Sequence, residues 1–176
     1  MCPLKIGLNK YLSIWNVCAG CRESLRLTDN SQHTRFKLYV FEGSKKVFDM
    51  DIVVGTAANK TVVFTDTLKY VVFSPYWNVP RSIVRKEILP GIRKSANYLV
   101  RHNMEQTGFS NGLPEIRQKP GGNNALGKVK FIFPNNYSIY FHDTPSQSLF
   151  EIEKRAFSHG CIRLSIPHYK SHYSAR

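Results

Sequence analysis

The segment Ser158–Arg163 holds the residue types that a cysteine nucleophile requires. A cysteine attacks a carbonyl group as its thiolate, so its surroundings must lower its pKa or accept its proton. Gly160 precedes Cys161, and its missing side chain lets the backbone approach a substrate closely. Arg163 follows two residues later and shares a face with the cysteine if the segment is extended, where it can hold a carboxylate or stabilise a thiolate. The segment predicts covalent, nucleophilic catalysis.

His142 is the candidate general base for Cys161. It ends an expected strand, and Asp143-Thr144-Pro145 then turns the chain away. The stretch between His142 and Ser158 is long enough for one short helix and a return, which brings the strand end beside the cysteine. These residues therefore predict a Cys–His pair built across two strands.

The elements that must position this pair are mostly short strands. Phe36, Leu38 and Val40 share one face, and apolar residues alternate with aspartates over 48–54, so the two segments predict a hairpin that turns at 42–44. Further strands are expected at 61–65, 68–73, 129–133, 137–142 and 161–164, with a short helix near 146–150.

One helical segment interrupts this β pattern. Residues 81–89 predict a short helix, Pro90 is expected to interrupt it, and 92–99 is expected to resume it. The polar stretch 100–115 contains glycine and proline and predicts a flexible connection or lid. The architecture expected is a mainly β fold, a β-sandwich or partly closed barrel with a short helical insertion.

Composition narrows the class of protein without identifying the partner. The chain of 176 residues has a formal net charge of +13, spread without a long basic run or a nucleic-acid-binding motif, so an anionic envelope polymer fits as well as a nucleic acid. No stretch is long and apolar enough to span a membrane. The first 21 residues resemble a secretion signal only weakly, and Cys18 and Cys21 are interpreted as an incidental pair.

His142 followed by Ser158-His159-Gly160-Cys161-Ile162-Arg163 resembles the signature of the YkuD-type L,D-transpeptidase domain. Segments 75–80, 118–127 and 141–145 look like the larger YcbB-like branch of that family. The resemblance covers roughly residues 36–164. It implies a catalytic domain over 35–165 with a capping insertion at about 81–115, a poorly specified segment over 1–34 and an atypical tail over 166–176.

The resemblance implies a reaction on peptidoglycan stem peptides. Cys161 would attack the amide between the third and fourth residues, an L-centre to D-centre bond, and release D-alanine. An amine of a neighbouring stem would then take the acyl group from the thioester, giving a 3-3 cross-link. Carbapenem-type β-lactams would be expected to acylate Cys161. No cofactor, metal or nucleic acid is expected, and the family implies a periplasmic or cell-envelope location with a function in cell-wall biogenesis and cell shape.

The same resemblance implies a role for each residue of the expected site. The backbone carbonyl near Asp143 is expected to orient His142, and the N–H groups of Gly160 and Cys161 are candidates for an oxyanion hole. The residues expected to shape the site are Ser158, His159, Gly160 and Asp143. The residues expected to bind substrate are Arg163, Tyr76, Trp77 and Asn78.

The residues alone leave three other hypotheses open. The chain could be a catalytically silent, wall-binding remnant, or an L,D-carboxypeptidase that uses water as acceptor. His142, His159 and Cys161 could in principle ligate zinc, although their spacing matches no common ligand motif and no fourth ligand is apparent.

Overall fold

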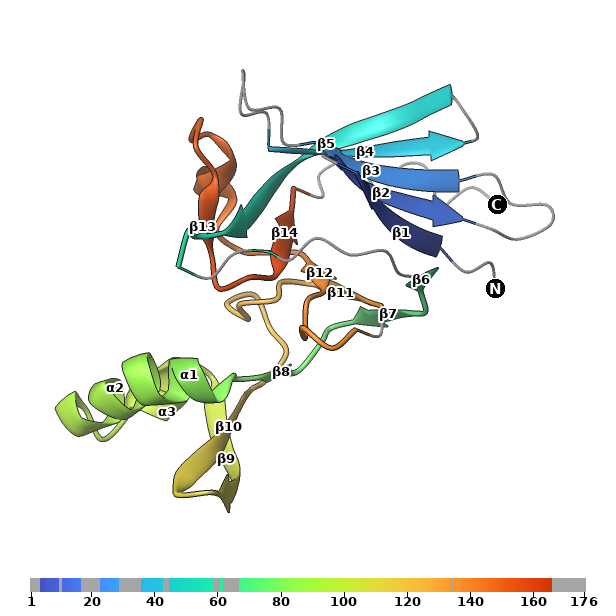
Figure 1. The fold of residues 1–176 in the computed structure, drawn as a ribbon. Helices are drawn as coiled ribbons and strands as arrows, with labels where there is room; N and C mark the ends of the chain where they lie inside the picture. Colours follow the sequence, from blue (N-terminus) through green and yellow to red (C-terminus); the bar gives the residue numbers. More distant parts are fainter. Residues whose placement is uncertain are drawn as a thin grey trace.

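The computed structural model describes residues 4–9, 11–16, 23–28, 36–42, 45–58, 61, 67–133 and 135–165. These residues form two sheets, one of eleven strands and one of three. The mainly β fold predicted from the sequence is confirmed (Figure 1). The tail at 166–176, the strand expected at 61–65 apart from Thr61, and both Cys18 and Cys21 lie outside the described residues.

The first half of the large sheet is an antiparallel meander. Its strands are β1 (Leu4–Asn9), β2 (Tyr11–Asn16), β3 (Glu23–Thr28), β4 (Lys37–Glu42) and β5 (Lys45–Gly55). The β4–β5 hairpin is the one that the alternating pattern predicts. No regular structure was expected in residues 1–34, because runs such as Leu25-Arg26-Leu27 alternate over too few residues to stand out from their surroundings.

The second half of the sheet carries the residues of the candidate site. Beyond β5 the strand order is β14 (Ile162–Leu164), β12 (Phe141–His142), β11 (Val129–Ile132) and β7 (Tyr70–Phe73). Strand β13 (Ala156–Ser158) pairs with β5, and β6 (Thr67–Leu68) pairs with β1. The two ends of this order, β6 and β7, are separated in the chain by Lys69 alone, so the sheet curls back towards itself but is no closed barrel.

The strand expected over 137–142 forms only at its end. Asn135 Oδ1 accepts from the backbone N–H groups of Tyr137 and Ile139 at 3.0 and 3.1 Å, and Ser138 has φ of +56°. This side-chain-closed turn competes with the ladder and delays pairing until Phe141. The helix expected near 146–150 is a single 3-10 turn, η2 (Gln147–Phe150), in the connection between β12 and β14.

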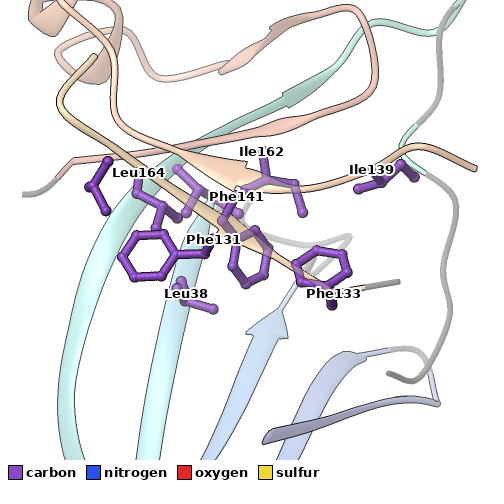
Figure 2. Packing of buried hydrophobic residues seen from close by; sticks show 9 residues of the cluster. Leu38, Phe131, Phe133, Ile139, Phe141, Ile162 and Leu164 are labelled. Carbon is purple, nitrogen blue, oxygen red and sulfur yellow. The ribbon is translucent and has the colours of Figure 1, made fainter. Parts of the chain in front are cut away.

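The main core lies on one face of β11, β12 and β14. Phe131, Phe141 and Ile162 are 7%, 3% and 1% exposed, and they pack together with Leu38 and Phe133 (Figure 2). Side chains alternate between the faces of a strand, so the residues between these apolar ones point to the opposite face. That opposite face carries the candidate site.

The insertion between β7 and β11 forms a lobe with its own core (Figure 1). We call this segment, residues 77–118, the insertion lobe. Its elements are β8 (Trp77–Asn78), α1 (Arg81–Ile83), the π-helical turn η1 (Val84–Ile88), α2 (Leu89–Lys94), α3 (Tyr98–Arg101), β9 (Met104–Ser110) and β10 (Leu113–Gln118). Strands β8, β10 and β9 make the small sheet.

Two expectations for the insertion lobe are wrong. Pro90 does not end the helix: the helical path continues through it, and the α pattern changes just before it to a π-helical turn, in which the Leu89 N–H bonds to the Val84 carbonyl five residues back. Residues 100–115 are no flexible connection, because most of them belong to the β9–β10 hairpin. Its Asn111-Gly112 turn has φ of +45° and +74°, and this dipeptide is itself a strong hairpin signal in the sequence.

Candidate active site

Three side chains stand in one row across the site face of the large sheet. The register pairs Lys130 with His142 between β11 and β12, and His142 with Arg163 between β12 and β14. Directly paired residues point to the same side of a sheet. His142 is thus flanked by two cations, Lys130 on β11 and Arg163 on β14, which are far apart in the chain.

Cys161 and Tyr140 lie directly before strands β14 and β12, one row further along the same face. The Ile162 N–H donates to the Tyr140 carbonyl at 3.1 Å, which sets Tyr140 beside Cys161. The Cys161 thiol lies 3.7 Å from the Ser138 carbonyl oxygen. Burial raises the pKa of this thiol, and hydrogen bonds from the Tyr140 backbone and hydroxyl together with the charges of Lys130 and Arg163 oppose that rise. Cys161 therefore lies on the same face as His142 and one row away from it, because His142 pairs with Arg163, two residues after the cysteine.

His142 is held as a neutral imidazole. Its side chain is buried, and Nδ1 lies 2.5 Å from the Asp143 carbonyl oxygen. A carbonyl can only accept, so Nδ1 carries the hydrogen and Nε2 keeps the free electron pair. Burial, followed by the charges of Arg163 and Lys130, lowers the pKa of His142 to about 4, although the Asp143 hydrogen bond acts in the opposite direction. The imidazole is therefore unprotonated at neutral pH.

The loop before Cys161 is fixed by Ser158 and Thr61. Ser158 Oγ accepts the Gly160 N–H at 3.0 Å and donates to the Cys161 carbonyl at 2.5 Å. Thr61 Oγ1 donates to the Gly160 carbonyl at 2.9 Å. Gly160 has φ of +118°, which favours glycine over any residue with a side chain. Because the Gly160 N–H is engaged by Ser158, it does not face an incoming oxyanion in this state.

Lys130 and Arg163 bring two cations to the thiol. The Lys130 Nζ lies 3.8 Å from the centre of the Tyr140 ring, and burial lowers the pKa of this lysine. Burial also lowers the pKa of Arg163, and its Nε atom is buried without a hydrogen-bond partner. Both charges favour the thiolate form of Cys161.

The insertion lobe reaches the site through Trp77 and Glu87. The Trp77 indole N–H donates to the Tyr140 hydroxyl, and Glu87 Oε1 lies 3.3 Å from His159 Nε2. The other two expected substrate residues contact the lobe itself: the guanidinium of Arg117 lies 4.3 Å from the centre of the Tyr76 ring, and Asn78 lines a cleft of about 380 Å³ in the lobe.

Tyr140 and Lys130 were missed as site residues. Both were within predicted strands, and Tyr140 precedes His142 by two residues, so strand alternation already placed it on the face of the expected base. Lys130 stands between two apolar residues of β11 and carries the same signal. Over the part of the chain that the structure describes, no group of three or more His, Cys, Asp or Glu side chains could hold a metal ion, and no helix is long and apolar enough to cross a membrane.

Comparison with known proteins identifies a family for this chain. Residues 28–174 match the YkuD model, described as an L,D-transpeptidase catalytic domain. A Haemophilus influenzae protein, provisionally named an L,D-transpeptidase, is 30% identical over 183 aligned residues; the alignment covers 92% of this chain and 37% of that protein. The solved structure of the Ldtfm–avibactam carbamoyl enzyme aligns at 14% identity with a TM-score of 0.42, over 73% of this chain and 36% of that one.

Proposed function

Because this chain belongs to the YkuD family of L,D-transpeptidase catalytic domains, we propose that it forms 3-3 cross-links in peptidoglycan through a thioester on Cys161. The observation that carries this proposal is the neutral, buried His142, which lies on the same face as the thiol and one row away from it. Peptidoglycan stem peptides are the substrates, and the cell envelope is the site of action.

In the first step His142 acts as general base. Its Nε2 takes the thiol proton while Sγ of Cys161 bonds to the carbonyl carbon of the third residue. The tetrahedral intermediate collapses when the carbon–nitrogen bond breaks, and the imidazolium returns the proton to the leaving amine. D-Alanine departs, and the acyl group stays on sulfur as a thioester. The Asp143 carbonyl stabilises the transient imidazolium through its hydrogen bond to Nδ1.

In the second step a stem-peptide amine attacks the thioester. His142 accepts a proton from the attacking amine, the carbon–sulfur bond breaks, and the thiolate recovers its proton. Water in place of the amine would release the free acid, which is the carboxypeptidase alternative. The Tyr140 hydroxyl and the charges of Lys130 and Arg163 stabilise the thiolate leaving group.

We assign the oxyanion hole to the Cys161 N–H rather than to both N–H groups of the loop. The Gly160 N–H already donates to Ser158 Oγ, and moving it would cost that hydrogen bond. Ser158 and Gly160 therefore hold the cysteine in place, and His159 connects the loop to Glu87 of the insertion lobe. We propose that this lobe caps the substrate, with Trp77 closest to the reacting groups through Tyr140.

The test is the incubation of a disaccharide-tetrapeptide with the protein, followed by mass spectrometry of products. A 3-3 dimer with release of D-alanine is expected for the wild type, and none for Cys161→Ala. Tripeptide without dimer would assign the carboxypeptidase activity, and no product from folded protein would leave the silent, wall-binding reading. Carbapenems are expected to add to Cys161 and, more slowly, to that cysteine in His142→Ala.

A further inference from the structure

Lys130 and Arg163 are cations with no carboxylate partner in the part of the chain that the structure describes. Neither side chain takes part in the ion pairs formed within the described residues, in which the basic partner is another lysine, another arginine or His159. Both side chains are half-buried, and within the described residues the buried Arg163 Nε atom has no hydrogen-bond partner. The Lys130 ammonium contacts the face of the Tyr140 ring.

Buried charges of one sign require compensation. Removing an ammonium or a guanidinium from water is costly unless an opposite charge or hydrogen-bond acceptors replace the lost hydration. The Cys161 thiol compensates one cation when it ionises, but two cations flank His142, so one more negative charge would complete the compensation. An unpaired guanidinium nitrogen beside a nucleophile is suited to a carboxylate, which matches its planar donors.

We propose that Lys130 and Arg163 form a carboxylate subsite that selects peptides with a free carboxylate within one residue of the amide attacked by Cys161. This inference rests on the proposed function and goes beyond it, because it defines a chemical requirement of the donor peptide. Lys130 is its new member, and it acts on the far side of His142 from Arg163.

Two carboxylates of a stem peptide satisfy this requirement. One is the terminal α-carboxylate of the departing fourth residue, and the other is a side-chain carboxylate on the third residue. Both lie within one residue of the scissile amide, so the row of cations cannot separate them by charge alone. Amidation of one carboxylate at a time distinguishes the two.

The experiment measures binding and turnover separately. The probe is a disaccharide-tetrapeptide that bears both carboxylates, compared with the same compound amidated at the terminus or at the side chain. Affinities are measured with Cys161→Ala, which binds without reacting. Amidation of the recognised carboxylate is expected to weaken binding about tenfold or more, because a charge-assisted contact is lost. In Cys161→Ala/Lys130→Met the same amidation should change affinity by less than about threefold.

Matched variants separate a lost contact from a damaged fold. Lys130→Arg keeps the charge and is expected to restore the preference, whereas Lys45→Met removes one positive charge from an exposed position on β5 and should leave it intact. Circular dichroism checks that each variant is folded. In turnover, Lys130→Met is expected to raise KM more than it lowers kcat.

The outcomes distinguish this inference from the proposed function. Equal affinity for all three compounds overturns the subsite, whether or not the wild type turns them over. A preference that persists unchanged in the Lys130→Met background overturns the assignment of Lys130. A carboxylate preference in binding without any turnover by the wild type would retain the subsite and overturn the transpeptidase reaction.

Discussion

His159 Nε2 lies 3.3 Å from Glu87 Oε1, and this contact joins the loop of the candidate nucleophile to the helical part of the insertion lobe. The two residues are far apart in the sequence, and both side chains are about half exposed. Trp77 makes a second connection from the lobe, through the Tyr140 hydroxyl. The lobe is therefore attached to the site by one exposed polar pair and one hydrogen bond between half-buried side chains.

The exposed pair is expected to contribute little to stability. Glu87→Gln keeps the shape of the side chain and removes its charge, and solvent-exposed ion pairs contribute about 0–1 kcal/mol. Urea unfolding should therefore show a loss of free energy of unfolding below about 1 kcal/mol, similar to that of Lys86→Gln on the same turn. Carbapenem acylation should slow by less than about threefold. A tenfold loss with an unchanged fold would show that the contact orders the nucleophile.

Stability is expected to fall in mild acid through His142. Its folded pKa is about 4, whereas an ordinary histidine titrates near 6.5, so the unfolded chain takes up the proton first as pH falls. No penalty exists above about pH 6.5, and up to about 3 kcal/mol is lost by about pH 4. The measurement is urea unfolding of wild type and His142→Asn across this range. Parallel pH curves for the two proteins would contradict the depressed pKa.

The rate of acylation is expected to persist at acidic pH. In the proposed mechanism the neutral form of His142 is the base. That form is present above its pKa of about 4, so the acid limb of the carbapenem acylation profile should lie well below 6.5. Lys130→Met removes a flanking charge that helps to lower this pKa, so it should move the limb to higher pH. A limb at 6.5 in the wild type, or no movement in the variant, would refute the electrostatic account.

Gly127→Ala is expected to disturb His142 indirectly. Gly127 has φ of +61°, and a Cβ there would overlap the side chain of Asp143, whose carbonyl binds His142 Nδ1. We expect a loss of at least about 1 kcal/mol from the backbone strain and slower carbapenem acylation as Asp143 shifts. Gly122→Ala is the control, because a Cβ there meets nothing within 4 Å. Equal behaviour of the two variants would contradict this role of Gly127.

The assignment to the YcbB-like branch, the domain bounds and the individual site residues remain predictions, whereas membership of the family is shown by the match over residues 28–174. Several local features were readable because they depend on neighbours in the chain. Gly160 before Cys161, the alternation of β5 and the Asn111-Gly112 turn all report on backbone geometry within a few residues.

The row of Lys130, His142 and Arg163 depends on tertiary structure. Alternation predicts which face of a strand each residue takes, but it says nothing of which strands are neighbours or in what register they pair. The parallel β12–β14 pairing and the antiparallel β11–β12 pairing set that register by burying Phe131, Phe141 and Ile162 against each other. The packing of these apolar side chains on one face decides which charges surround the histidine on the other.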